Sequence, residues 1–206
     1  MIFFDAEERV RMNNKKKERE LTIVSWFDED YGEMETVERE DIEDFIIIAQ
    51  DTDIICGFNC FAFDYTLFEF TEWPVTQANE KTLDFYDFLR NQVTNDRPFN
   101  VPGLSLNALS IVNLGDRKID LKGTPAKLWE SGSPDARELV IAYNQKDVFL
   151  LRELFWKAYN EEELLYEPDI PEEELDEGMG IPIDCSELLN LHDYLQSQFY
   201  EHVVGW

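Results

Sequence analysis

Apolar and polar runs along the first part of the chain predict a strand hairpin followed by further alternating elements. Residues 1–4 (MIFF) are continuously apolar, which is typical of a central strand covered on both faces. A turn at Asn13-Asn14 leads to the apolar run at 21–27 (LTIVSWF), so the two strands are expected to pair as a hairpin. The next segments are expected to form a short third strand, a helix and a buried strand, at 34–37, 40–50 and 53–58.

The middle of the chain continues this alternation. A helix that begins near 61 is expected to close at Trp73-Pro74, because proline cannot continue a helix. Ser133 and Pro134 suit the N-cap and the first turn of a long helix. The expected elements are helices at 61–70, 104–115 and 134–159 and a fifth strand at 82–89. A hairpin followed by alternating strands and helices predicts an α/β fold with a mixed sheet.

The composition changes near residue 158. Residues 158–206 begin as an acid-rich stretch broken by prolines, which predicts an acidic connecting segment draped on the surface or partly disordered. They end in a stripe of apolar residues at helical spacing, which predicts a C-terminal amphipathic helix. The stripe consists of Leu188, Leu191, Leu195 and Phe199. We expect this helix to pack on the core, and docking to a replication or repair protein is the alternative.

Composition narrows the class of protein. The chain has 206 residues, 44% of them hydrophobic, so it is not a disordered acidic tail. Its 45 acidic and 18 basic residues give a net charge of -27, which fits a halophilic origin, a viral origin or nucleic-acid mimicry. The three cysteines contain no C-x-x-C pair, so a disulfide framework or zinc site is not expected. Without an export leader or a long apolar run, we expect a cytoplasmic protein with no membrane span.

The candidate functional residues are acids that lie at the ends of apolar elements. Asp5 and Glu7 are two positions apart on the opening strand, so they share a face, and a divalent cation such as Mg²⁺ would relieve their repulsion. Asp64 follows a buried strand, and Tyr143 and Asp147 share one face of a helix. Each acid alone has a simpler interpretation as a solvated surface residue. Together, acids on three buried elements are a stronger sign of a metal site.

Three motifs carry a family resemblance. FFDAE, GFNCFAFD and YNQKD resemble the motifs of the DEDD 3′–5′ exonucleases of the ribonuclease H-like (DnaQ-like) superfamily, over about residues 1–157. Tyr143, four positions before Asp147, is similar to the tyrosine branch (DEDDy). The run from Asn59 to Asp64 resembles the proofreading exonuclease domain of family B DNA polymerases, as do TLDFYDFL and LSLNALSI. The resemblance implies a ribonuclease H-like fold, with a five-stranded mixed sheet and helices on both faces.

The resemblance also implies a set of site residues. Two Mg²⁺ or Mn²⁺ ions would be held by four carboxylates, those of Asp5, Glu7, Asp64 and Asp147. Such ions activate the attacking water and stabilise the leaving 3′-oxygen. Tyr143 would orient the water and the scissile phosphate, since a phenol is a poor base at neutral pH. The terminal nucleotides would be contacted by Asn59, Phe61 and Phe63, although core packing is the alternative for the two phenylalanines.

Basic residues are concentrated directly after the opening motif. Six of the eighteen bases fall within eleven residues, namely Arg9, Arg11, Lys15, Lys16, Lys17 and Arg19. A second, weaker island contains Arg117, Lys118, Lys122 and Lys127. These islands are candidates for phosphate contacts that the overall charge would otherwise disfavour. The alternative for the first island is a solvated hairpin tip.

The function that follows from the resemblance is a metal-dependent 3′–5′ exonuclease. It would hydrolyse single-stranded DNA ends to nucleoside 5′-monophosphates by a two-metal mechanism, in DNA repair or replication. Two alternatives stay open: an exoribonuclease with the same site, and a non-enzymatic acidic module that mimics DNA or binds a polymerase. The enzymes require the motif acids, whereas the acidic module does not.

Overall fold

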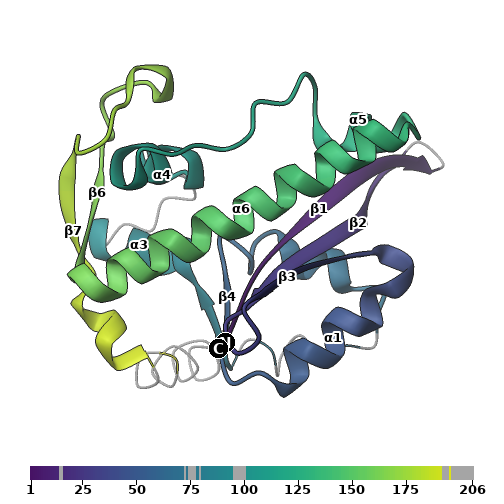
Figure 1. Cartoon of the computed structure of the whole chain (residues 1–206), viewed down its shortest axis with the longest axis horizontal. Coiled ribbons are helices and arrows are strands. Elements are labelled where there is room, and N and C mark those ends of the chain that lie inside the picture. The colour runs from purple at the N-terminus through teal and green to yellow at the C-terminus, as the bar shows by residue number, and fades with distance from the viewer. Residues whose placement is uncertain are drawn as a thin grey trace.

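A computed structural model of the protein describes residues 1–13, 16–71, 73, 78, 80–94, 101–191 and 195. Its main sheet has five strands, β1 (Ile2–Asn13), β2 (Lys16–Asp28), β3 (Glu33–Glu38), β4 (Ile55–Gly57) and β5 (Thr82–Asp84). The strand order is β3-β2-β1-β4-β5 (Figure 1). The β1–β2 and β2–β3 pairs are antiparallel, and the β1–β4 and β4–β5 pairs are parallel. The sheet is therefore mixed, as the sequence predicts.

Helices cover both faces of this sheet. The α-helices are α1 (Ile42–Asp51), α3 (Phe85–Val93), α4 (Leu106–Leu114), α5 (Pro125–Glu130) and α6 (Pro134–Glu161). Short 3₁₀ turns are η1 (Arg39–Asp41), η2 (Asp64–Phe68), η3 (Glu172–Glu174) and η4 (Ser186–Asn190). Phe3 packs in a core with α3, α4 and α6, whereas Ile2 and Phe4 pack in a second core with α1 and η2. This arrangement confirms the expected α/β class and is consistent with the ribonuclease H-like fold.

Strand β1 is longer than the sequence predicts, and this changes where its acids lie. It extends through Asn13, and ion pairs across the hairpin such as Arg9–Glu20, at 2.7 Å, support the added length. Strand β4 pairs with β1 only at Ile2 and Phe3. Asp5 and Glu7 therefore lie within β1, just beyond the end of β4, and not at a strand tip.

Two further predictions of secondary structure are wrong. Residues 61–70 form only the 3₁₀ turn η2, where the rings of Tyr65 and Phe68 pack against Trp73. Aromatic side chains lose rotamer freedom in an α-helix, which weakens the helical preference of this segment. The fifth strand ends at Asp84, because the Asp84 carboxylate accepts a hydrogen bond from the backbone N–H of Asp87 and caps α3. Helix α5, which follows its N-cap Thr124, was not predicted.

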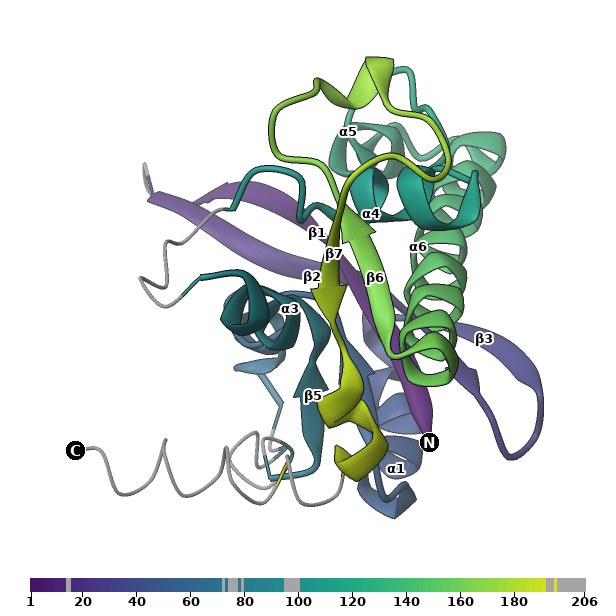
Figure 2. The same cartoon turned by 90° about the vertical axis from the view of Figure 1, so that its left-hand side faces the viewer.

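The C-terminal part contains regular structure as well. Strands β6 (Glu163–Tyr166) and β7 (Ile181–Asp184) form a separate antiparallel pair beside α4 (Figure 2). Leu188, Leu191 and Leu195 are buried in the core that also holds α3 and α6. Phe199 lies outside the described residues. Within the described part of the chain, the helices are all too short or too polar to cross a membrane.

Candidate active site

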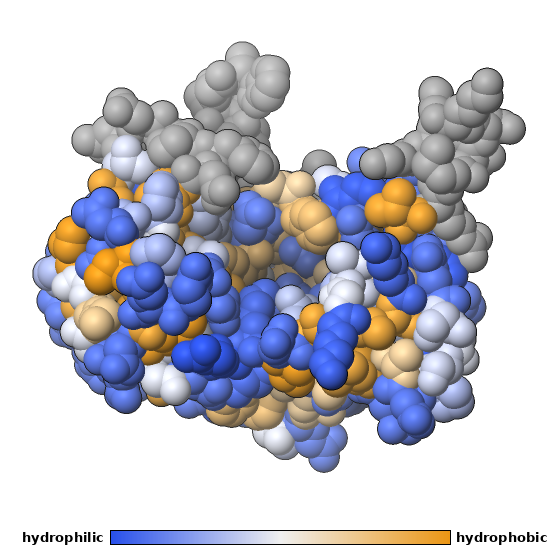
Figure 3. Space-filling view, turned by 90° about the horizontal axis from the view of Figure 1, so that it is seen from above, coloured by the Kyte–Doolittle hydropathy of each residue, from blue (hydrophilic) through white to orange (hydrophobic). Residues whose placement is uncertain are grey.

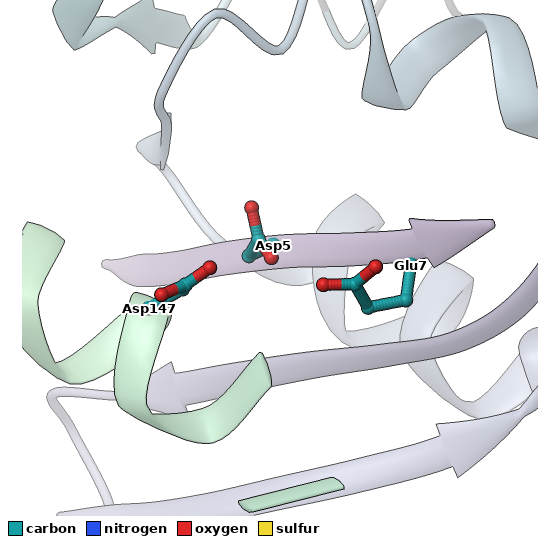
Figure 4. A group of neighbouring side chains, drawn as sticks. All are labelled: Asp5, Glu7 and Asp147. Carbon is teal, nitrogen blue, oxygen red and sulfur yellow. The ribbon is translucent and has the colours of Figure 1, made fainter. Parts of the chain in front are cut away.

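Three carboxylates from two elements meet at one point. Asp5 and Glu7 project from the same side of β1, since alternate residues of a strand share a face, and Asp147 projects from α6. Their ligand oxygens all lie within 4.8 Å of one another. Figure 4 shows the carboxylates of Glu7 and Asp147 directed toward each other on either side of Asp5. Among the described residues, this is the one group of side chains with the spacing of a metal site.

Helix α6 fixes this group by crossing the sheet over β1 and β2 (Figure 1). Asn144 and Asp147 are three positions apart on α6, so they face β1 together, and both are buried. The Asn144 Nδ2 donates a hydrogen bond to the Asp5 Oδ2 at 2.5 Å. Strand and helix are therefore joined at the acids themselves, which limits how far the carboxylates can separate.

Asp64 lies beside the three acids and lines the same cavity. Its Oδ1 accepts a hydrogen bond of 2.9 Å from the backbone N–H of Ala6, the residue between Asp5 and Glu7. It is not a member of the group within 4.8 Å. The cavity has a volume of about 480 Å³ and is lined by Asp5, Glu7, Asp64, Tyr143 and Asp147 among others. Figure 3, which views the side bearing α4, α5 and the β1–β2 hairpin, shows the surface hollowed near its middle.

Burial and mutual repulsion raise the pKa values of these acids. Burial and the charge of Asp147 raise the pKa of Asp5 to about 7. Burial and the charges of Asp5 and Asp147 raise the pKa of Glu7 to about 9. Burial also raises the pKa of Asp64 and of Asp147 above the ordinary range. At neutral pH and without a cation, the four carboxylates therefore cannot all be ionised at the same time.

Lys118 supplies one positive charge to the group. Its Nζ donates to the Asp147 Oδ2 at 2.7 Å. Burial acts to lower the pKa of Lys118, but the charges of Asp147 and Asp5 raise it above its ordinary value, so the ammonium stays protonated. The sequence analysis places Lys118 only in the second, weaker island of basic residues. The contact joins positions 29 residues apart, so no local sequence pattern predicts it.

Tyr143 lies one turn before Asp147 on α6 and lines the cavity. Burial and the charge of Asp147 raise its pKa to about 12. The Lys118 Nζ lies 5.6 Å from the centre of its ring. The hydroxyl is therefore protonated at neutral pH and is available as a hydrogen-bond donor and not as a base.

The donor set fits a hard divalent cation. Carboxylate oxygens are the ligands that Mg²⁺ and Mn²⁺ prefer. The Asp147 Oδ1 is buried and has no hydrogen-bond partner among the described residues, while its other oxygen is held by Lys118. A buried carboxylate oxygen without a partner is costly, and a cation would satisfy it. Asp5, Glu7 and Asp147 are the residues that would hold such an ion, with Asp64 beside them.

The predicted nucleotide contacts divide into two kinds. Asn59 and Phe63 line the cavity, and the Phe63 side chain is 38% exposed. Phe61 does not line it and packs against Tyr65 at 5.9 Å between ring centres. The backbone N–H groups of Asn59 and Phe61 both donate to the buried Asp84 carboxylate, at 2.8 and 3.0 Å. Asp84 thus fixes the loop that carries Asn59, which has a positive φ of 59°.

The described arginines of the basic hairpin are already paired with acids. Arg9 binds Glu20, and Arg19 binds Glu8. The Arg19 guanidinium also stacks on the Phe63 ring at 3.9 Å from its centre, which links the hairpin to the cavity wall. Of the remaining predicted residues, Lys15 and the side chains of Arg11, Lys16 and Lys17 lie outside the described residues.

Comparison with known proteins identifies a related fold. No protein-family model and no curated protein matches the chain. A solved structure with a similar fold is the family B DNA polymerase from the hyperthermophilic archaeon Pyrobaculum calidifontis, with a TM-score of 0.53 and 17% sequence identity. The likeness covers 76% of this chain but only 24% of the polymerase. It shows that the mixed sheet with its helices is an architecture found within a family B DNA polymerase.

Proposed function

We propose that the protein is a metal-dependent 3′–5′ exonuclease of the DEDDy type that acts on single-stranded DNA. One observation carries the proposal: three carboxylates with oxygens within 4.8 Å of one another line a cavity that also contains Asp64 and Tyr143. These are the five residues that the sequence motifs predict. The fold likeness to a family B DNA polymerase supports a nucleic-acid enzyme as the class.

In this proposal Asp5, Glu7 and Asp147 hold divalent cations together with Asp64. When bound, two such ions would lower the pKa of water and neutralise charge on the phosphate, which is the chemistry that phosphodiester hydrolysis needs. Asn144 keeps the Asp5 carboxylate oriented through its 2.5 Å hydrogen bond. The backbone N–H of Ala6 does the same for Asp64 at 2.9 Å.

Tyr143 and Lys118 would act on the substrate side of the cavity. The Tyr143 hydroxyl, with its pKa of about 12, donates a hydrogen bond to the attacking water or to a phosphate oxygen. The Lys118 ammonium holds the Asp147 carboxylate at 2.7 Å and adds positive charge where a phosphate must approach an acidic protein. Neither residue is proposed as the base.

The cavity wall suits unpaired bases. The half-exposed Phe63 ring, backed by the Arg19 guanidinium, offers a face on which a base can stack without sequence preference. Asn59 on the neighbouring loop can donate to a sugar or base. We therefore propose a single-stranded 3′ end as the substrate and DNA as its chemical nature, in the cytoplasm and in a repair or replication process.

A time course with end-labelled oligonucleotides tests this function. Single-stranded DNA and RNA, labelled at the 5′ or the 3′ end, are incubated with the protein in Mg²⁺, Mn²⁺ or EDTA. We expect 5′-labelled DNA to shorten stepwise from its 3′ end, and EDTA to stop the reaction. Faster cleavage of RNA would assign the exoribonuclease alternative. Binding to a polymerase with no cleavage of any substrate would support the acidic module and refute the enzyme.

The variant Asp5→Ala separates these outcomes further. We expect it to keep the fold and to lose nearly all cleavage, because Asp5 contributes an oxygen to the central group of three. Equal rates for Asp5→Ala and wild type would show that any measured activity comes from a contaminant or another site.

A further inference from the structure

The acidic segment between β6 and β7 packs against α4 and is hydrogen-bonded to it. Leu175 is buried against Ala108, Ile111 and Val112 of that helix. The backbone N–H of Gly178 donates to the Val112 carbonyl at 2.7 Å. These contacts fix the position of η3, the 3₁₀ turn that carries Glu172.

Glu172 uses this position to bind the first turn of α4. Its carboxylate accepts hydrogen bonds from the Ser105 hydroxyl and from the Asn107 Nδ2, the latter at 2.9 Å. A carboxylate can only accept, so it selects the orientation in which the Asn107 amide nitrogen faces it. The Asn107 Oδ1 then faces away and accepts from the backbone N–H of Lys118 at 2.9 Å.

The Lys118 end of this chain of hydrogen bonds reaches the acid group. The Lys118 Nζ donates to the Asp147 Oδ2 at 2.7 Å. The turn that carries Lys118 is also held on α6 by the ion pair between Asp116 and Lys146, at 2.5 Å. The backbone of Lys118 is thus fixed from α4 and from α6, and its ammonium is directed at one oxygen of Asp147.

We infer that Glu172 and Asn107 are positioning residues that hold Lys118 against Asp147, so the acidic segment between β6 and β7 completes the active site. This inference rests on the proposed function for its effect on turnover, but the contact to Asp147 exists independently of it. Disturbing Glu172 loosens the attachment of Lys118 to α4, while the Asp116–Lys146 ion pair still holds the turn on α6. Turnover then falls, while a metal ion meets less competition from the ammonium for the Asp147 carboxylate.

Glu172→Gln is the test variant, because a glutamine amide can both donate and accept and no longer selects the Asn107 orientation. Glu173→Gln is the matched control: it removes the same charge from the next residue of η3, and Glu173 makes no hydrogen bond or ion pair within the described ranges. Both changes are also made in a Lys118→Met background. Such a double-mutant cycle separates an effect that passes through Lys118 from an independent one.

We expect Glu172→Gln to lower kcat roughly fivefold, the effect of one weakened hydrogen bond, with KM little changed. Its affinity for Mn²⁺, measured by titration calorimetry on the full chain, should rise about twofold, because the competing ion pair of Lys118 with Asp147 is weakened. In the Lys118→Met background, adding Glu172→Gln should change neither kcat nor the affinity for Mn²⁺. Glu173→Gln should change neither quantity in either background.

Three results would overturn the inference: an equal loss in both backgrounds, an equal loss with Glu173→Gln, or weaker Mn²⁺ binding by Glu172→Gln. The first indicates a merely structural role and the second a bulk charge effect. If wild type cleaves no nucleic acid, the proposed function fails, but the Mn²⁺ cycle still decides whether Glu172 acts through Lys118.

Discussion

Replacing Asp147 with asparagine should separate function from stability. The Asp147 side chain is 3% exposed and accepts from the Lys118 Nζ at 2.7 Å, and its ligand oxygen lies within 4.8 Å of those of Asp5 and Glu7. With an effective dielectric constant of about 20, the attraction to Lys118 is about 6 kcal/mol and each repulsion about 3 kcal/mol. Asp5 is ionised only above its pKa of about 7 and Glu7 only above its pKa of about 9, so attraction and repulsion are of similar size above about pH 9.

The free energy of unfolding of Asp147→Asn, measured in EDTA above pH 9, should accordingly lie within about 2 kcal/mol of wild type, because the two contributions offset each other there. Cleavage of single-stranded DNA should fall about 10³-fold, because a charged ligand of the metal site is lost. Urea titrations followed by tryptophan fluorescence measure the first quantity, and end-labelled oligonucleotides the second. Asp135→Asn, the same substitution at an exposed position in the first turn of α6, is the control: it should leave cleavage unchanged and lower stability by less than about 1 kcal/mol.

A different result would refute this reasoning. Breaking a structural buried ion pair costs about 3 to 5 kcal/mol. If Asp147→Asn is destabilised by that amount or more in EDTA, Asp147 serves mainly to anchor Lys118. If it keeps wild-type cleavage, Asp147 is not a metal ligand of the enzyme.

Tyr143→Phe should lower kcat only about fivefold, the effect of one lost hydrogen bond, as measured by steady-state cleavage. Burial and the charge of Asp87 raise the pKa of Asp84 to about 6, so the stabilisation that Asp84 contributes is complete below about pH 4 and declines as pH rises through 6. In urea titrations from pH 4 to 7, Asp84→Asn should make the decline in the free energy of unfolding shallower and leave the part that comes from the buried acids of the site. Arg19→Gln should raise KM for single-stranded DNA and reduce the slope of log K against log salt by about 0.7, unless Arg19 only pairs with Glu8.

The sequence predicts the acids better than it predicts their surroundings. The spacing of Asp5 and Glu7 and that of Tyr143 and Asp147 reflect the strand and helix periods, which fix the shared faces before any folding information is available. The structure brings all four to one cavity. Periodicity also predicts most of α1, α4 and α6 from their apolar spacing.

The sequence could not predict contacts between side chains that are far apart along the chain. Lys118 reaches Asp147, and Glu172 reaches Asn107 across 65 positions, through side chains with no local signature. The length of β1 depends on cross-strand ion pairs in its hairpin with β2, which no single segment contains. The early end of β5 did have a local signal, since Asp84 and Asp87 have the spacing of an N-cap and its partner.

Anomalous diffraction from crystals of the full chain soaked in Mn²⁺ tests the central claim most directly. We expect Mn²⁺ at the oxygens of Asp5, Glu7 and Asp147, at distances of about 2.0 to 2.6 Å typical of oxygen ligands. Crystals of Asp147→Asn under the same conditions should lose or weaken the peak. A saturating soak that leaves this group without Mn²⁺, or puts the ion at other acids of the surface, would contradict the account.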